Sequence, residues 1–350
     1  MISLSLLLLL SPDLALASAT ESPPAETLEQ KEMRGIWLSR FGWRTQSELE
    51  AAVNHISESG FNSIFFQVRG TFDSFYRSSL EPWSDRLTGN LGQDPNWDPL
   101  ASVLAIAHAN DVEVHAWMNT FPIWRGEDLP QSQGVAHPLE QHPEWIISDQ
   151  NGEQMALNPV YVFADPSIPA VRSHVAAVAH ELTSLYDVDG VHLDYIRFPE
   201  PEYGEASVAR GHIEATVAEV RAAIDVPLSA AVWGIHTNRW GWERVSQGSN
   251  DYYQDSVAFM QRGLVDAIAP MIYWPVTEVS GERLDFSTLA ADHVQHRGDA
   301  SVWTGISAEL SYEEVAECIR ASRRVGAQGF VIFDYTQIRA DMERLKREFF

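Results

Sequence analysis

Hydrophobic and polar residues follow two alternating patterns from Met33 onward. Short apolar runs, several with a period of two, predict β-strands, and longer segments with apolar residues every three or four positions predict amphipathic helices. The predicted strands are 33–39, 61–70, 112–120, 191–194, 226–234, 265–274, 301–309 and 329–335. The predicted helices are 45–59, 97–110, 168–186, 207–225, 251–262, 286–297, 312–325 and 340–348.

These segments make eight strand–helix units with no break that would indicate a second domain. Regular alternation of this kind predicts an α/β fold with parallel strands, closed into a (β/α)8 TIM barrel. The alternative is an open, doubly wound sheet, which normally begins with a glycine-rich turn that this chain lacks. We therefore expect the barrel.

Long loops follow the second, third and fifth predicted strands, and the one after the third strand reaches about Ser167. All three loops extend from the carboxyl ends of strands, whereas the connections at the opposite end are short. Barrel enzymes build their sites from the loops at the carboxyl ends. The ligand is therefore expected at this face.

The first 31 residues differ in composition from the rest of the chain. Residues 1–19 resemble a signal peptide, with an apolar run at 4–10 and the small residues Ala17, Ser18 and Ala19 at the cleavage site, although no Lys or Arg precedes the run. We expect an exported protein, periplasmic or extracellular, with a flexible lead-in at 20–31 and the barrel at 32–350. A disordered or wrongly assigned start is the alternative. The apolar run is too short to span a bilayer, so no stable membrane insertion is expected.

Composition excludes several classes of function. A formal net charge of −25 argues against binding nucleic acid. The only lysines are Lys31 and Lys346, so neither Schiff-base nor pyridoxal phosphate chemistry is expected, and no glycine-rich nucleotide-binding motif is present. The chain has one cysteine, Cys318, and no His-x-His motif, so we expect neither a cofactor nor a catalytic metal. A calcium ion bound by a loop is the one metal that these observations leave open.

Asp194 is the strongest candidate for a catalytic residue. In the strand that it ends, Val191 and Leu193 share one face, while His192 and Asp194 share the other. A buried face that carries a carboxylate is costly unless the group is paired or functional. An active-site role is therefore predicted at the strand end, and a buried salt bridge to Arg197 or Arg69 is the structural alternative.

Glycoside hydrolysis requires a second carboxyl group across the scissile bond. Asp334 and Glu309 both lie at the ends of predicted strands, and Glu200 follows Pro199. We favour Asp334 as the partner of Asp194 and keep Glu309 as the other candidate.

The inward faces of the strands also collect side chains that suit a sugar. Aromatic rings stack on sugar rings, charged and amide groups bind hydroxyls, and the chain has twelve tryptophans. For His192 a core position is the alternative, and for Arg34 and Arg69 the alternative is neutralisation of buried acids. The predicted substrate-binding residues are Arg34, Trp37, Arg69, His115, Trp117, Asn119, His192, Arg197, Trp233, Tyr273 and Trp274.

Four motifs resemble those of the glycosyl hydrolase-like 10 family, over a region from about Met33 to about Asp334. They are MRGIWL at 33–38, FQVR at 66–69 with Asp73 and Tyr76, HAWMN at 115–119, and DGVHLDYIRFP at 189–199. The resemblance implies a glycosidase-like (β/α)8 barrel of exported bacterial proteins, some associated with peptidoglycan strands stripped of peptides. It also implies that Asp194 lies in the cleft. Many relatives carry a second Asp next to it, where this chain has Tyr195.

The leading hypothesis is a glycosidase (an O-glycosyl hydrolase) that acts on a polysaccharide or oligosaccharide, in particular bacterial cell-wall glycan. A non-catalytic carbohydrate-binding barrel is the alternative from another class, and the Tyr195 substitution keeps it open. Lytic cleavage of the glycan, which needs only one acid and leaves anhydro ends, is the other alternative.

Overall fold

Eight parallel strands close into the predicted barrel in the computed structural model, which describes residues 31–277 and 284–350. The strand order around the barrel is β1, β10, β9, β8, β7, β6, β3 and β2. Their bounds are β1 Met33–Leu38, β2 Ser63–Arg69, β3 Glu113–Asn119, β6 Gly190–Asp194, β7 Leu228–Trp233, β8 Ala267–Met271, β9 Ser301–Ser307 and β10 Gly329–Phe333. The predicted signal peptide and nearly all of the lead-in lie outside the described residues.

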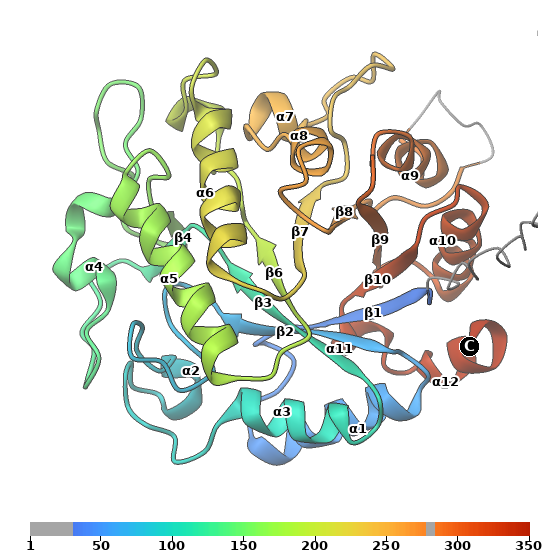
Figure 1. Cartoon of the computed structure of the whole chain (residues 1–350), viewed down its shortest axis with the longest axis horizontal. Helices are drawn as coiled ribbons and strands as arrows, with labels where there is room; N and C mark the ends of the chain where they lie inside the picture. The colour runs from blue at the N-terminus through green and yellow to red at the C-terminus, as the bar shows by residue number, and fades with distance from the viewer. Residues whose placement is uncertain (1–30, 278–283) are drawn as a thin grey trace, which may run out of the picture. The chain divides into compact units, whose positions relative to one another are not determined.

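Helices surround the barrel (Figure 1). The larger ones are α1 Gln46–Glu58, α3 Pro99–His108, α5 Pro169–Leu185, α6 Ala209–Ala223, α8 Ser256–Gln261, α9 Phe286–Gln295, α10 Tyr312–Arg324 and α12 Met342–Phe349. Local sequence explains several helix starts: the Asp98 side chain caps α3 with Pro99 in its first turn, and Ser311 and Glu314 form a capping box at α10. The predicted helix 251–262 is in fact shorter, because Asp255 caps α8 and the short α7 (Gly248–Asp251) precedes it.

The alternation within the strands separates two hydrophobic cores. Outward residues such as Ile36, Ile64 and Val191 pack against the helices in the large core. A smaller cluster fills the barrel interior and consists of Met33, Trp37, Phe65, Trp117, Ala267, Ala269, Trp303 and Val331. Apolar side chains therefore fill the barrel interior beneath the carboxyl ends of the strands, where its polar side chains gather.

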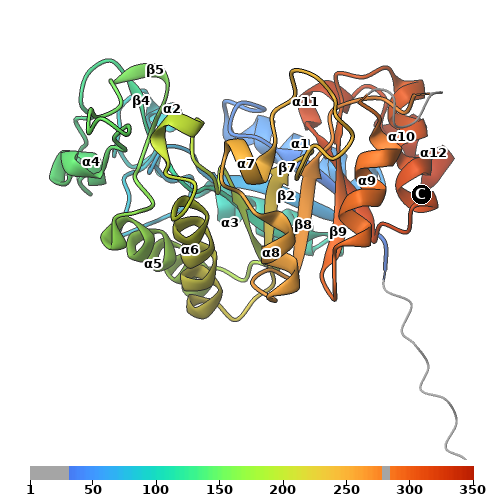
Figure 2. The ribbon, with the colours of Figure 1, turned by 90° about the horizontal axis from the view of Figure 1, so that it is seen from above.

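The loop after β3 has its own structure, which the sequence pattern did not predict. It contains β4 (Pro122–Gly126) and β5 (Asn158–Phe163), an antiparallel pair at the upper left of Figure 2, with α4 (Pro138–Gln141) and a 3₁₀ turn (Pro143–Trp145) between them. Three further short elements are α2 (Asp85–Thr88), a 3₁₀ turn (Pro201–Tyr203) and α11 (Tyr335–Ile338). Within the described ranges, no helix is long and apolar enough to cross a membrane.

Candidate active site

A cavity of about 510 Å³ opens at the carboxyl ends of the barrel strands. It combines two carboxylates, an arginine, two amides and several aromatic rings, which is the chemistry expected of a sugar site. The lining residues are Trp37, Ser39, Phe41, Gln67, Trp117, Asn119, Tyr161, Asp194, Tyr195, Arg197, Ala231, Trp233, Met271, Tyr273, Phe333 and Asp334. The structure therefore brings together many of the predicted site residues, with Asp194 and Asp334 among them.

Asp194 is the last residue of β6, beside Asn119 at the end of β3. Its Oδ2 accepts a hydrogen bond from Trp117 Nε1 at 3.1 Å, and its Oδ1 accepts the backbone N–H of Tyr195 at 2.6 Å. Burial raises the pKa of Asp194 from 3.8 to about 6, although these hydrogen bonds and the nearby Arg197 oppose the rise. Asp194 is thus a buried carboxyl group that holds its proton to an unusually high pH.

Asp334 follows β10 and caps α11. Its Oδ2 accepts a hydrogen bond from Ser39 Oγ at 3.1 Å, and its Oδ1 accepts the backbone N–H and the hydroxyl of Thr336. These three donors fix the orientation of a side chain that is 7% exposed and lines the cavity. The fold therefore holds this second carboxylate rigidly at the same face as Asp194.

Two tyrosines lie close to the carboxylates. Burial raises the pKa of Tyr273 well above its usual value, and Asp194, Tyr195 and Asp334 raise it further, so Tyr273 lies near both acids. Burial likewise raises the pKa of Tyr195, whose backbone adopts a left-handed conformation (φ 51°) directly after Asp194. Both phenols therefore stay protonated at neutral pH and can donate hydrogen bonds to a ligand.

Asn119 provides a free donor in the cavity. Its Oδ1 accepts a hydrogen bond from Gln67 Nε2 at 3.1 Å, which fixes the orientation of the amide. The Nδ2 atom is buried and has no hydrogen-bond partner among residues 31–277 and 284–350. Because an unpaired buried donor is costly, a ligand oxygen that accepts from Nδ2 would bind favourably.

Aromatic side chains surround Arg197 at the cavity wall. Its guanidinium lies 4.8 Å from the ring centre of Tyr195, 5.3 Å from Trp233 and 4.9 Å from Tyr252. These contacts, together with the hydrogen bond from Nη1 to the carbonyl of Phe198, hold the cation in place. The result is an aromatic wall with one positive charge, suited to stacking on a sugar ring.

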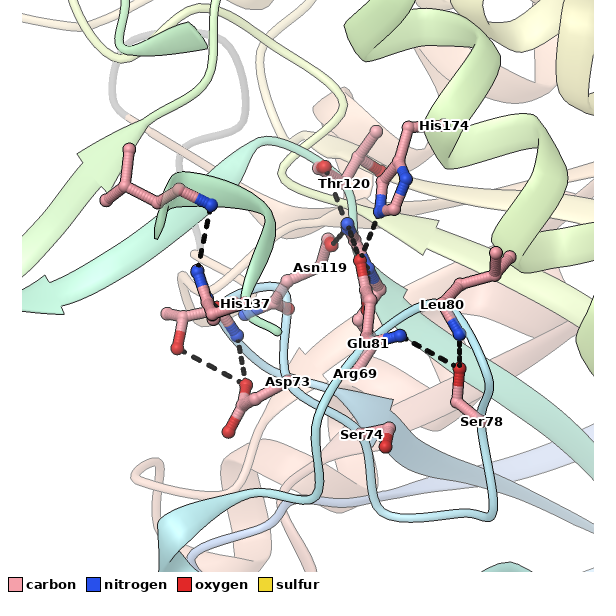
Figure 3. Close-up of polar contacts among 12 residues, drawn as sticks. Arg69, Asp73, Ser74, Ser78, Leu80, Glu81, Asn119, Thr120, His137 and His174 are labelled. Carbon is pink, nitrogen blue, oxygen red and sulfur yellow. Dashed lines mark hydrogen bonds and ion pairs between the residues drawn. The ribbon is translucent and has the colours of Figure 1, made fainter. Parts of the chain in front are cut away.

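Arg69 was predicted to bind substrate, but it is fully buried and lies outside the cavity lining. A register shift between Gln67 and Arg69 breaks the alternation of β2, and the fully buried guanidinium pairs with Glu81 and donates to the carbonyls of Asn119 and Thr120 (Figure 3). Burial raises the pKa of Glu81, but Arg69 and His174 outweigh that effect and hold it at about 2. Arg69 therefore secures the loop after β2 to the end of β3.

Three other residues that were predicted to bind substrate also lie outside the cavity lining. Arg34, near the start of β1, donates to the carbonyl of Gly60 at the opposite end of the barrel. His115 stacks on Phe65 with ring centres 4.7 Å apart, well below the strand ends. His192 is fully buried, accepts a hydrogen bond from Trp37 Nε1, and contacts Ser229 Oγ through Nδ1. Arg34 is thus at the end of the barrel opposite the cavity, and His115 and His192 lie too deep inside the barrel to line the cavity.

Glu309 and Trp274 also lie outside the cavity lining. Glu309 lies two residues beyond β9 and accepts a hydrogen bond from Gln337 at 3.3 Å. Trp274 packs beside Gly234, while its neighbour Tyr273 lines the cavity. The structure thus leaves Asp334 as the strand-end carboxylate that shares a cavity with Asp194.

Several lining residues were not predicted from the sequence. Phe41 comes from the loop after β1 and Tyr161 from β5, so no strand periodicity could place them. Gln67 lies within β2, two residues before Arg69, and Ser39 directly follows β1. In residues 31–277 and 284–350 no three histidine, cysteine or carboxylate side chains are grouped to hold a metal ion.

A closed (β/α)8 barrel with acidic and aromatic side chains at the carboxyl ends of its strands is typical of glycosidases. The chain belongs to the glycosyl hydrolase-like 10 family, whose model matches residues 32–211. The family assignment that the sequence motifs indicated is therefore confirmed.

Curated relatives carry the same kind of name. The chain is 29% identical over 322 residues to glycosyl hydrolase DigH of Escherichia coli K12, with 76% of this chain and 71% of DigH covered. It is 26% identical over 296 residues to glycosyl hydrolase YngK of Bacillus subtilis, with 72% of this chain and 56% of YngK covered. These names and the family support a glycoside hydrolase.

Solved structures share the fold at low identity. An α-L-fucosidase from Paenibacillus thiaminolyticus matches with a TM-score of 0.57 and 14% identity, over 90% of this chain and 48% of that one. The catalytic domain of a β-amylase from Paenibacillus polymyxa matches with a TM-score of 0.58 and 8% identity, over 88% and 94%. The predicted (β/α)8 fold is confirmed.

Proposed function

We propose that this protein hydrolyses glycosidic bonds in bacterial cell-wall glycan, with Asp194 and Asp334 as the carboxyl pair. The observation that carries the proposal is Asp194, a buried carboxyl group with a pKa of about 6 in a cavity that it shares with Asp334. A glycosidase needs one carboxyl group that keeps its proton and one that acts as a carboxylate.

Asp194 acts as the general acid in this scheme. Its proton passes to the glycosidic oxygen as the bond to the anomeric carbon breaks, so that the leaving sugar departs as a neutral alcohol. Asp334 acts at the anomeric carbon, either as the nucleophile or as the base that activates water. If Asp334 is the nucleophile, water then breaks the glycosyl ester, supplies the hydroxyl of the new reducing end and returns a proton to Asp194. If Asp334 is the base, it takes the proton of the attacking water, and Asp194 regains its proton from solvent.

The cavity wall accounts for sugar binding. The rings of Trp233 and Tyr195 offer stacking surfaces beside Arg197, and Asn119 Nδ2 and the phenol of Tyr273 can donate to hydroxyl oxygens. The choice of cell-wall glycan among polysaccharides rests on the resemblance of the sequence motifs, together with the signal-like segment at residues 1–19. We accordingly propose that the protein is exported to the periplasm or the cell exterior.

Tyr195 favours one competing function. It occupies the position where many relatives carry a second acid, so a barrel that binds glycan without cleaving it is the second candidate. A binding barrel would need the aromatic wall but not the proton of Asp194. It therefore predicts that replacing Asp194 by Asn leaves glycan binding intact and that the wild type releases no products.

The test is mass spectrometry of soluble products from peptide-free peptidoglycan, with wild type, Asp194→Asn and Asp334→Asn. We expect fragments that have gained one water from the wild type and at least a thousandfold less product from either variant. Asp299→Asn, at an exposed position, is the matched control and should retain full activity. Anhydro fragments would show lytic cleavage instead, and the absence of products with retained binding would support the binding barrel.

A further inference from the structure

A second cavity, of about 250 Å³, lies beside the candidate active site and shares Phe41 with it. Arginines from three different segments line it: Arg40 from the loop after β1, Arg86 from α2 and Arg125 from β4. The other lining residues are Thr71, Asp73, Ser84, Asp85, Leu91 and Trp124. A ligand in the active-site cavity could therefore extend past Phe41 into a cavity rich in arginine.

The three guanidinium groups converge on one ring. They lie 4.6 Å (Arg40), 4.5 Å (Arg86) and 6.0 Å (Arg125) from the ring centre of Phe41, which is 48% exposed. Over the described ranges, no carboxylate lies within the 4.0 Å ion-pair distance of any of these three groups. Clustering three cations costs free energy unless an anion balances them, and in a chain of net charge −25 chance is a poor explanation.

Arg40 carries an unsatisfied donor. Its side chain is buried, with 4% of the residue exposed, and Nη2 donates to the hydroxyl of Tyr161 at 2.9 Å. Nη1 is also buried, yet no residue in the described part of the chain forms a hydrogen bond with it. A buried guanidinium N–H without an acceptor is costly, so a ligand with an anionic oxygen would bind favourably here.

Two aspartates in the second cavity only partly balance this charge. Asp73 uses Oδ1 to accept hydrogen bonds from the backbone and hydroxyl of Thr71. Asp85 lies at the start of α2, and burial and Asp73 raise its pKa. Three guanidinium groups against two carboxylates leave a formal charge of +1, which one further carboxylate would neutralise.

We propose that Arg40, Arg86, Arg125 and Phe41 form a subsite for a carboxylate carried by a sugar next to the one that is cleaved. A guanidinium binds a carboxylate through two parallel hydrogen bonds, and the exposed face of Phe41 supports the apolar part of the same sugar. The carboxylate can belong to a lactyl ether on an amino sugar or to a uronic acid. This inference rests on the proposed function, because it assigns the neighbouring sugar in the same cleft.

The test compares one glycan in two forms, cell-wall glycan freed of peptides and the same material with its carboxylates reduced to alcohols. We expect the wild type to prefer the intact form by about tenfold or more in kcat/KM, because the loss of hydrogen bonds to a charged group weakens binding by at least that factor. In Arg86→Gln and Arg125→Gln the ratio should fall towards one. Arg347→Gln, an exposed arginine on α12, removes the same charge elsewhere and should leave the ratio unchanged.

Equal activity of the wild type on both forms, or an unchanged ratio in both variants, would overturn the subsite. Binding measured by calorimetry in the Asp194→Asn background separates this result from failure of the proposed function. If the wild type cleaves neither form but binding still prefers the carboxylate and depends on Arg86, only the hydrolase proposal fails. Uronic acid oligomers are the second arm: preferential binding of these over the lactyl-ether glycan would identify the uronic acid source.

Discussion

Replacing Asp194 by Asn should remove activity and, at neutral pH, stabilise the fold. Burial raises the pKa of this carboxyl group from 3.8 to about 6, so the folded state holds its proton more tightly than the unfolded state does. Deprotonation above pH 6 therefore costs the folded protein about 3 kcal/mol, at about 1.4 kcal/mol for each pKa unit. An amide, which does not ionise, avoids that cost.

The sign of the effect sets the pH window. Because the folded-state pKa is raised, the wild type loses stability as the pH rises from about 4 to about 6, and the loss is complete above that range. The amide has only one acceptor oxygen for the N–H groups of Trp117 and Tyr195, a loss of about 1 kcal/mol at every pH. The change in the stability difference with pH therefore isolates the ionisation of Asp194.

The assay is urea unfolding of wild type and Asp194→Asn at pH 4 and pH 7.5. We expect the stability of the variant relative to the wild type to rise by about 2 kcal/mol between the two pH values, since part of the total already applies at pH 4. Asp299→Asn should show no such change because its side chain is exposed. A pH-independent difference for Asp194→Asn would refute the raised pKa and with it the assignment of the acid.

Three further results follow from the same geometry. If Asp194 donates the proton, kcat/KM on peptide-free glycan should fall above about pH 6; a rise through pH 6 would make it the nucleophile instead. Trp117→Phe removes a hydrogen bond that lowers the pKa of Asp194, so this limb of the pH profile should move to higher pH. Arg69→Met leaves the Glu81 carboxylate buried without its cation, and urea unfolding should show a loss of about 3–5 kcal/mol, largely recovered in the Arg69→Met/Glu81→Leu double variant. A loss below about 1 kcal/mol in the single variant would contradict the structural role of this pair.

The sequence was sufficient to predict the barrel because each strand carries its own local signal. Apolar residues facing the helices recur with period two, and the eight predicted strands appear within a few residues of their expected bounds. The insertion after β3 was not predictable in this way. Its strands β4 and β5 are short and begin or nearly begin with proline, and they pair across an intervening segment that contains α4.

Position along the strand decided which of the predicted site residues line the cavity. Asp194, Asn119 and Asp334 lie at the last residue of a strand or just after it, and all three line the cavity. His115 shares the inward face of β3 with Asn119 but lies four residues nearer the strand start, at about 3.3 Å for each residue, whereas Arg34 lies near the start of β1 on the same outward face as Ile36. Alternation identifies the face of a strand, and depth must be argued separately from where the strand ends.

Arg69 shows why alternation alone also fails at a strand end. Its partner Glu81 lies twelve residues later in an irregular loop, and nothing in the local pattern indicates that the two will be buried together. The pair nevertheless matters for the site, because Arg69 also binds the carbonyls of Asn119 and Thr120 (Figure 3). Asn119 carries a buried donor with no partner among the described residues, so an ion pair outside the cavity lining fixes the backbone from which that donor projects. The arginine that was expected to bind the sugar thus supports a residue that can.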